Sequence, residues 1–313
     1  MIQLGIVVPC YNEEQVLRQT TACLFALLNR LISSAKIAEN SSIYYVDDGS
    51  RDATWALIQS LATENAHIGG VKLSRNCGHQ NALLAGLFTV PGDVLVSIDA
   101  DLQDDVDAIV QMVDACIDGA DIVYGVRDDR TTDTLFKRGT AQGFYRLMEA
   151  LGVDIIYNHA DYRLMTRRAI DALMDFHEVN LFLRGIIPLL GFRSAIVYYK
   201  RSERLAGKSK YPLRRMLSLA WEGVTSFSVM PLRIVTVLGA AIFALTMLMS
   251  LYIVGVRLFT NLAVPGWAST VLPIYLLGGI QIFCVGILGE YLGKVYKEVK
   301  ARPRYIVEKV IGL

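Results

Sequence analysis

Two long runs without a charged residue lie in the C-terminal third of this 313-residue chain, and they constrain its fold more than any other feature. Ile234–Val256 covers about 23 residues and Ser269–Gly289 about 21, and roughly 20 apolar residues in a helix are enough to cross a bilayer. Pro273 and the glycines of the second run are tolerated in membrane helices. The sequence therefore predicts two transmembrane helices joined in a hairpin. A buried helical hairpin of a soluble protein is the alternative.

Basic residues flank the outer ends of the hairpin, whereas the connecting loop holds only Arg257. Because cytoplasmic flanks of membrane helices are enriched in Lys and Arg, both termini are expected in the cytoplasm. Met1–Pro9 lacks the basic start and long apolar run of a signal peptide, which agrees with this orientation. The net charge of +1 gives no support for a nucleic-acid partner.

The segment just before the hairpin, residues 212–230, has apolar residues at helical spacing. They are Leu213, Met216, Leu217, Ala220, Trp221, Val224 and Phe227. Arg214, Arg215 and Ser218 lie off that stripe, so the segment is predicted to be an amphipathic helix on the membrane surface. An ordinary helix of a globular domain is the alternative.

The N-terminal two thirds alternate between short apolar runs and helical patterns. The predicted strands are Leu4–Val8, Ile43–Val46, Val71–Leu73, Val94–Ile98 and Asp121–Gly125, and predicted helices begin near Asn12 and span Asp52–Ala62, Gln80–Val90 and Ile109–Gly119. Such alternation with short links is typical of an α/β domain, whose mostly parallel sheet has helices on both faces. We expect this domain to cover residues 1–211, followed by the amphipathic helix at 212–230, the hairpin at 231–293 and a tail at 294–313.

Polar and charged residues follow three of the predicted strands. Asp47 and Asp48 follow one strand, Arg75 follows another, and Asp99 and Asp101 follow a third. Ligands of open α/β sheets bind at the carboxyl ends of the strands. The pattern therefore predicts a binding site at this edge of the sheet.

The strongest chemical signal is Asp99-Ala100-Asp101 at a strand end, with Gln103 two residues further on. Mg²⁺ is usually held by one or two carboxylates together with substrate phosphates and water, so these side chains are candidate ligands of a divalent cation. An acidic turn is the alternative, because Asp is common in turns.

The second signal is Asp47-Asp48-Gly49-Ser50. Carboxylates at a strand end can accept hydrogen bonds from a uracil imide or from ribose hydroxyls, and Gly49 permits a close turn of the backbone. The segment is a candidate site for a nucleotide.

Taken in order along the chain, these segments resemble the GT-A family-2 glycosyltransferases, and in particular their polyprenyl-phosphate branch, which includes dolichyl-phosphate mannose synthases and bactoprenol glucosyltransferases. The matching motifs are Pro9-x-Tyr11-Asn12-Glu13, Asp47-Asp48-Gly49-Ser50, Arg75-Asn76-x-Gly78, Asp99-Ala100-Asp101-Leu102-Gln103-Asp104, Gly125-x-Arg127, Asp161-Tyr162-Arg163-Leu164-Met165, Phe182-Leu183-Arg184-Gly185, Arg204-x-x-Gly207-x-Ser209-Lys210-Tyr211 and Arg302-Pro303-x-Tyr305. The likeness covers nearly the whole chain. One departure is Val106-Asp107, where the family often has Pro-Glu or Pro-Ile.

The resemblance implies a Rossmann-like GT-A domain and assigns roles to individual residues. The residues implied around the nucleotide sugar are Pro9, Tyr11, Glu13, Asp47, Asp48, Arg75, Asp99, Asp101 and Gln103. Asp99, Asp101 and Gln103 would bind Mg²⁺ or Mn²⁺ with the diphosphate, and Asp161 would lie near the reacting sugar. The residues implied at the acceptor phosphate are Arg127, Arg138, Arg204, Ser209 and Lys210. Asp99, Asp101, Asp161, Arg127 and Lys210 would act in catalysis.

The expected activity is inverting transfer of a sugar, with glucose favoured, from a UDP-linked donor to the phosphate of a membrane polyprenyl phosphate. A processive polysaccharide synthase is one alternative, but the chain lacks the Gln-x-x-Arg-Trp motif typical of that class. A non-catalytic membrane scaffold or lipid-flipping subunit is another, although it would have no need of a divalent-cation site. We expect an integral protein of a bacterial inner membrane, with its catalytic domain in the cytoplasm.

The C-terminal tail contains Tyr305–Ile311, which is rich in β-branched residues and follows Pro303. It is predicted to be a short strand, and it must pair with a sheet edge of its own domain or of a neighbouring subunit. Packing several hairpins together would bury their glycines, so a homo-oligomer is expected. The resembling bacterial glucosyltransferases form tetramers, and the resemblance therefore implies a homotetramer.

Overall fold

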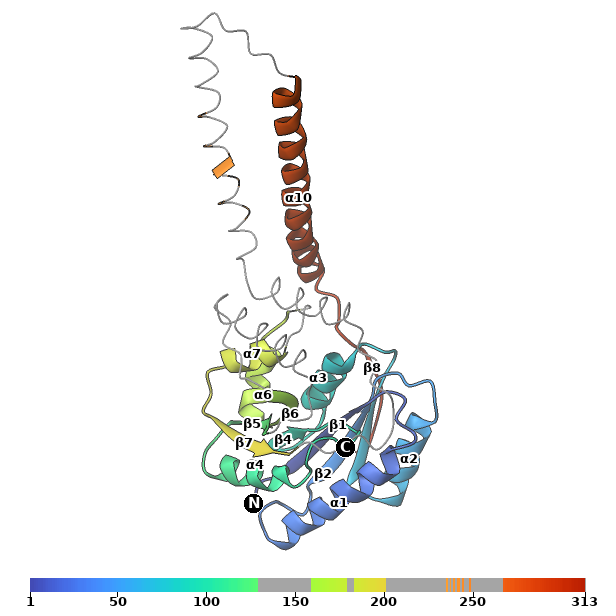
Figure 1. Cartoon of the computed structure of the whole chain (residues 1–313). Coiled ribbons are helices and arrows are strands. Elements are labelled where there is room, and N and C mark those ends of the chain that lie inside the picture. The colour runs from blue at the N-terminus through green and yellow to red at the C-terminus, as the bar shows by residue number, and fades with distance from the viewer. Residues whose placement is uncertain are drawn as a thin grey trace, which may run out of the picture. The chain divides into compact units, whose positions relative to one another are not determined.

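The computed structural model describes residues 1–128, 159–178, 183–200 and 267–312, together with a few positions between 235 and 248. The chain divides into two compact units (Figure 1). The first is formed by Met1–Arg215 with Ala301–Leu313, and the second is Met216–Lys300. The C-terminal tail thus belongs to the same unit as the N-terminal domain, although 85 residues of the second unit separate them along the chain.

The first unit is built on an eight-stranded sheet over the described residues, in the order β7-β5-β6-β4-β1-β2-β3-β8. The strands are β1 Leu4–Cys10, β2 Ser42–Asp47, β3 Ile68–Leu73, β4 Val94–Ser97, β5 Ile122–Arg127, β6 His159–Thr166, β7 Ser194–Tyr199 and β8 Val307–Ile311. The two exceptions to parallel pairing are β6, which is antiparallel to β4 and β5, and β8, which is antiparallel to β3. The prediction of a mostly parallel α/β sheet is confirmed, and each of the five predicted strands lies within one residue of an observed strand or inside it.

Helices cover both faces of the sheet, as Figure 1 shows. One face packs against α1 (Leu17–Ser33), α2 (Thr54–Glu64) and α4 (Ala108–Ile117), whose apolar side chains share one core with alternate residues of β1, β2 and β4. The other face packs against α3 (His79–Thr89), which also contacts α6 (Arg167–Met174). Gly86 of α3 allows a close approach, because a Cβ atom there would lie 2.4 Å from the Val7 side chain.

The strand register brings the functional residues to one edge of the sheet. Asp47 at the end of β2 pairs with Cys10 at the end of β1, and Ser97 at the end of β4 pairs with Val7 of β1. Arg127 and Tyr199 are paired at the ends of β5 and β7. Because β6 runs in the opposite direction, its beginning lies at this same edge. The edge therefore collects residues from six strands.

The C-terminal strand β8 lies beside β3 and completes the sheet of its own chain. A contact between Lys72 Nζ and Glu308 Oε1, at 3.0 Å, joins the two strands. The predicted strand at the C-terminus is confirmed, and of its two expected partners it takes the domain of its own chain. The predicted tetramer is not tested by this pairing and stays a prediction.

The second unit contains α10 (Trp267–Val299), which includes Pro273. Near its end the ammonium of Lys300 lies 4.2 Å from the centre of the Tyr296 ring. Among the helices of the described ranges, none combines the length and the apolar character required of a membrane span. The two predicted spans therefore stay predictions, and the predicted amphipathic helix at 212–230 lies outside the described residues.

Candidate active site

The loop after β2 is fastened to the loop after β3 through Asp48. The backbone N–H groups of Cys77 and Gly78 donate to the two oxygens of its carboxylate, at 2.6 and 2.9 Å. Gly49, at a φ of +66°, permits this contact, because a Cβ atom there would lie 2.5 Å from the carbonyl carbon of Arg75. Burial, reinforced by Asp47, raises the pKa of Asp48 although the two N–H donors lower it. Asp48 therefore holds two loops together.

The neighbouring Asp47 differs from Asp48, because only one of its two carboxylate oxygens accepts a hydrogen bond from the described residues. Its side chain is completely buried, and the backbone N–H of Ser50 donates to Oδ1 at 3.1 Å. Oδ2 is buried and has no hydrogen-bond partner among the residues that the structure describes. Because a buried polar atom is costly without a partner, this oxygen is suited to accept a hydrogen bond from a ligand.

The loop after β1 is held against the start of α2. The Glu13 N–H donates to Thr54 Oγ1 at 2.9 Å, and the Asn12 N–H donates to Ser50 Oγ at 3.0 Å. Pro9 lies inside β1, whereas Tyr11 exposes 41% of its surface. Arg75, after β3, is exposed as well. The predicted nucleotide residues of β1, β2 and β3 thus lie in adjoining loops at one edge.

Asp99 and Asp101 lie in the acidic loop, defined here as residues 99–105, between β4 and α4. The Gln103 N–H donates to Asp101 Oδ1 at 3.2 Å, and the intervening Leu102 has a φ of +53°, which a bulky residue rarely adopts. Desolvation raises the pKa of Asp99 to about 6, and the carboxylates of Asp104, Asp161 and Asp101 add to the effect. The Asp99 side chain nonetheless keeps 41% of its surface exposed, so it is accessible to a ligand.

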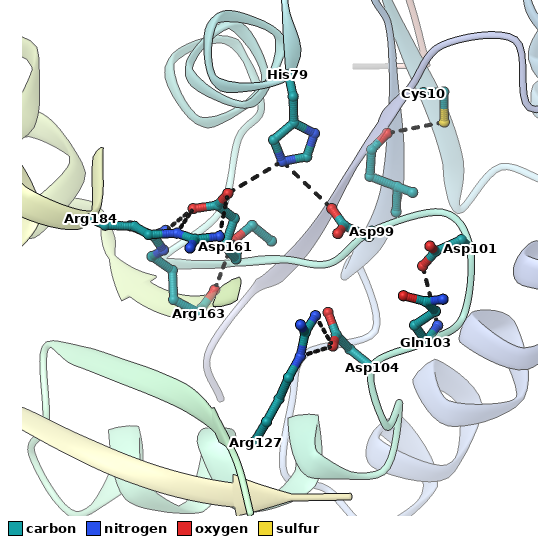
Figure 2. A network of polar contacts seen from close by, with 12 residues as sticks. Cys10, His79, Asp99, Asp101, Gln103, Asp104, Arg127, Asp161, Arg163 and Arg184 are labelled. Atoms are coloured by element: carbon teal, nitrogen blue, oxygen red, sulfur yellow. Dashed lines mark hydrogen bonds and ion pairs between the residues drawn. The ribbon is translucent and has the colours of Figure 1, made fainter. Parts of the chain in front are cut away.

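His79, the first residue of α3, lies between two of these carboxylates (Figure 2). Its Nε2 atom is 3.6 Å from Asp99 Oδ1 and 3.7 Å from Asp161 Oδ2. His79 was not among the site residues predicted from the sequence. The signal that could have found it is its place directly after the Arg75-Asn76-x-Gly78 motif, at the beginning of a helix that follows a strand end.

Asp161, near the beginning of β6, is bound by two arginines. Arg163 Nη2 donates to Oδ1 at 2.6 Å, and Arg184 of α7 (Leu183–Leu189) donates to both oxygens at 3.4 and 3.5 Å. Desolvation acts to raise the pKa of Asp161, but Arg184, Arg163 and His79 outweigh it and hold this pKa well below the usual range. Arg163 is itself buried, and within the described part of the chain its Nε and Nη1 groups have no hydrogen-bond partner.

Arg127, at the end of β5, pairs with the acidic loop. Its Nη2 and Nε groups donate to Asp104 Oδ1 at 3.0 and 3.3 Å, and the Tyr199 hydroxyl donates to the same oxygen at 2.5 Å. Figure 2 shows the guanidinium group of Arg127 directed at Asp104. The predicted role of Arg127 at the acceptor phosphate stays a prediction, but its immediate partner is this carboxylate.

The predicted site residues that the structure describes thus gather at one edge of the sheet. Arg138, Arg204, Ser209 and Lys210 lie outside the described residues. Within the described ranges, the protein does not bring three or more His, Cys, Asp or Glu side chains together in a group that could hold a metal ion. A cation at Asp99 and Asp101 would therefore need further ligands from a substrate or from water.

Comparison with known proteins identifies the family. The family model described as glycosyl transferase family 2 matches residues 5–174. The uncharacterized glycosyltransferase YkoT of Bacillus subtilis is 50% identical, over 97% of this chain and 91% of the relative. The bactoprenol glucosyl transferase derived from prophage SfII in Shigella flexneri is 37% identical, over 98% of each chain.

Among solved structures, the mannosyl-3-phosphoglycerate synthase of Rubrobacter xylanophilus aligns with a TM-score of 0.49 at 16% identity, over 71% of this chain and 72% of that one. The family match covers more than half of the chain, and the two relatives span nearly all of it. This chain therefore belongs to glycosyl transferase family 2 and is a glycosyltransferase.

Proposed function

We propose that this enzyme transfers glucose from a UDP-linked donor to the phosphate of a membrane polyprenyl phosphate, with inversion at the anomeric carbon. The acceptor and the sugar are supported by the relative from Shigella flexneri, which is named a bactoprenol glucosyl transferase and matches this chain almost from end to end.

The observation that carries the acceptor class is the pairing of Asp161 with Arg163 and Arg184. A carboxylate held ionised by two guanidinium groups is a weak base, whereas transfer to a hydroxyl group needs a base that removes its proton. A phosphate monoester has a second pKa near ~6 and is already an anionic nucleophile at neutral pH. Asp161 then orients the acceptor or a sugar hydroxyl, and a single displacement by the phosphate oxygen inverts the anomeric centre.

The donor nucleotide is supported by Asp47. Its Oδ2, without a partner among the described residues, can accept the imide N–H of a uracil base, while both oxygens of the neighbouring Asp48 already accept the amides of Cys77 and Gly78. Tyr11, exposed in the adjoining loop, is placed to contact the same nucleotide.

The side-chain oxygens of Asp99, Asp101 and Gln103 fit a divalent cation, Mg²⁺ or Mn²⁺, bound together with the diphosphate. Asp99 and Asp101 provide hard oxygen ligands. Desolvation is the main cause of the raised pKa of Asp99, and the nearby carboxylates of Asp104, Asp161 and Asp101 add negative charge that a cation would offset. Gln103 is the third predicted ligand. When bound, the cation neutralises charge that develops on the departing diphosphate. Arg127, Arg138, Arg204, Ser209 and Lys210 are proposed to reduce the repulsion between donor and acceptor phosphates.

The membrane placement rests on the sequence. The two charge-free runs and their basic flanks support two spans in a bacterial inner membrane, with both termini in the cytoplasm. Single cysteines at Gly266 and Glu308 test this orientation, because the proposed hairpin places them on opposite sides of the membrane. Labelling of both from one side would contradict it.

The homotetramer is also proposed, and light scattering in detergent tests it.

A donor screen tests the proposed reaction. Purified protein is incubated with polyprenyl phosphate, Mg²⁺ or Mn²⁺, and UDP-glucose or another nucleotide sugar, and the lipid product is identified by mass. The matched control replaces polyprenyl phosphate by polyprenol, which lacks the phosphate and should not react. Transfer to polyprenol, or a product with several sugars, would contradict the proposal. The anomeric configuration measured by NMR decides between inversion and retention.

A further inference from the structure

The acidic loop that holds Asp99 and Asp101 is fastened at its far end by side chains from neighbouring strands. Asp104 exposes only 1% of its side chain, and three donors reach its Oδ1 atom: the Tyr199 hydroxyl and two groups of Arg127. One residue further on, the Tyr162 hydroxyl donates to the backbone carbonyl of Asp105 at 2.8 Å. A buried carboxylate is stable only when it is paired and hydrogen-bonded. The loop can therefore keep Asp104 buried only while these contacts are present.

The two tyrosines also support each other. The rings of Tyr162 and Tyr199 meet edge to face, with their centres 5.2 Å apart, and both residues are almost completely buried. Desolvation and the neighbouring Asp104 raise the pKa of Tyr199, so its hydroxyl keeps its proton and remains a donor at neutral pH. Arg127 Nε donates to the same hydroxyl oxygen at 3.2 Å. Tyr199 thus links the loop, β5 and β7.

The conformation of the loop explains why such support is needed. Leu102 lies between Asp101 and Gln103 with a φ of +53°. For a bulky side chain this conformation costs about 1–3 kcal/mol and persists only when the surrounding structure enforces it. Without fixed contacts at Asp104 and Asp105, the strained segment would relax, and the carboxylates of Asp99 and Asp101 would lose their fixed orientation.

We propose that Tyr199 is a positioning residue of this enzyme: through Asp104 it fixes the acidic loop, and so it sets the orientation of Asp99 and Asp101 toward the donor diphosphate and its cation. The proposal rests on the proposed function, in which this loop binds the donor. Tyr199 does not touch the reacting atoms. It is also the last residue of β7, and in the sequence the predicted acceptor residues, from Arg204 to Lys210, follow soon after it.

The Tyr199→Phe variant tests the proposal, because it removes the hydroxyl while the ring remains to pack on Tyr162. Hydrogen exchange is measured by mass spectrometry on the full-length protein without metal. Peptides that cover residues 99–105 are expected to exchange about tenfold faster in the variant, which corresponds to the loss of one hydrogen bond to a charged group. Exchange in β1 and β2 should be unchanged. The matched control is Tyr198→Phe on the same strand, where the side chain is 60% exposed and no effect is expected.

Calorimetry with Mn²⁺ in the presence of UDP gives the second readout. The Mn²⁺ dissociation constant should rise about tenfold in Tyr199→Phe and stay at the wild-type value in Tyr198→Phe. Unchanged exchange of the loop in Tyr199→Phe would overturn the proposal, and so would faster exchange spread evenly over the whole sheet, which indicates a general structural role. If the wild-type protein bound no Mn²⁺, the proposed cation site would fail, while the exchange data would still decide the role of Tyr199.

Discussion

The two halves of the active-site edge are stabilised in different ways. At the ends of β1, β2 and β3, carboxylates are held by backbone N–H groups of adjoining loops, as Asp48 is by Cys77 and Gly78. At the ends of β4 to β7, carboxylates are held by charged side chains, as Asp161 is by Arg163 of its own strand and by Arg184 of α7. The first half therefore depends on backbone groups of adjoining loops, and the second on side chains that the order of strands and the packing of α7 bring together.

This difference suits the two tasks proposed for the site. Backbone amides keep a fixed charge distribution and a fixed position, which is adequate for recognising a nucleotide. Side-chain ion pairs instead set the charge state of the groups around the reacting sugar, because opposite charges favour the ionised form of a carboxyl group. Changes in the second half should therefore alter charge and stability together, whereas changes in the first half should act mainly through single hydrogen bonds.

The largest effect is expected from Asp161→Asn. The substitution leaves the guanidinium of Arg163 buried without its ionic partner, and breaking a buried ion pair in this way costs about 3–5 kcal/mol of folding free energy. Urea denaturation measures the loss, and transferase activity should fall as well. Asp171→Asn, on the exposed side of α6, is the control and should unfold at the wild-type urea concentration. Equal stability of Asp161→Asn and wild type would show that the ion pair does not support this half of the site.

Asp101→Asn should separate activity from stability. The asparagine keeps an oxygen to accept the Gln103 N–H, so the fold should be retained. The loss of one anionic ligand at the departing diphosphate should lower kcat by about 10²–10³-fold. Initial rates over a range of Mg²⁺ or Mn²⁺ concentrations, together with the midpoint of thermal unfolding, check both parts. Near-normal turnover at ordinary metal concentrations would remove Asp101 from the metal site.

The pH dependence of stability should report the raised pKa of Asp99, in the second half of the site. Its pKa is about 6 in the folded protein, and the unfolded value is near ~4. Between these values the unfolded chain has released a proton that the folded chain still binds. The stability of the metal-free protein should therefore fall as pH rises from about 4 to about 6.

Thermal unfolding of wild type and of Asp99→Asn at a series of pH values measures this contribution. The difference between the two proteins should change across that pH window and be constant above about pH 7. Added Mn²⁺ should stabilise the wild type most at the upper end of the window, where Asp99 is ionised. A difference that does not vary with pH would mean that Asp99 titrates at its ordinary value.

The smallest effect is expected from Asp48→Asn. The asparagine oxygen can accept one of the two amide N–H groups, but its own NH₂ group faces the other donor, so one hydrogen bond is lost. The expected loss of stability is about 1–2 kcal/mol, with a higher KM for the nucleotide sugar and a nearly unchanged kcat. Steady-state kinetics and urea denaturation measure the two quantities. If Asp48→Asn lost as much folding free energy as Asp161→Asn, the two halves of the active-site edge would not differ in how they are stabilised.

The sequence predicted the first half of the site better than the second. In the first half, β1 and β2 are short apolar runs followed by polar residues, and this local pattern was sufficient to predict Asp47 and Asp48 at one edge. In the second half, the same pattern predicted only the acidic residues after β4, beginning with Asp99. The order of strands is not local. Nothing in the sequence pattern indicates that β6 enters antiparallel between β4 and β5, and that insertion brings Asp161 within reach of His79.

The partners of the predicted residues were harder to predict than the residues themselves. Arg163 and Arg184 lie in motifs that the resemblance identified, but their shared contact with Asp161 depends on how β6 and α7 pack. Arg127 was expected to face a phosphate, and its contact with Asp104 joins β5 to a loop more than 20 residues earlier. Such pairings follow from tertiary packing, for which spacing in the sequence gives no signal.

The pairing of β8 with β3 has a consequence for biosynthesis. Lys72 and Glu308 are in contact although 236 residues separate them. At a synthesis rate of roughly 5–20 residues per second, β3 leaves the ribosome roughly 12–50 s before the strand that covers its edge. During that interval β3 is an open edge on which another chain could pair. Residues that are translated after the whole second unit are thus the ones that cover the edge of β3, and a ribosome that stalls in the preceding segment leaves a nascent chain prone to aggregation.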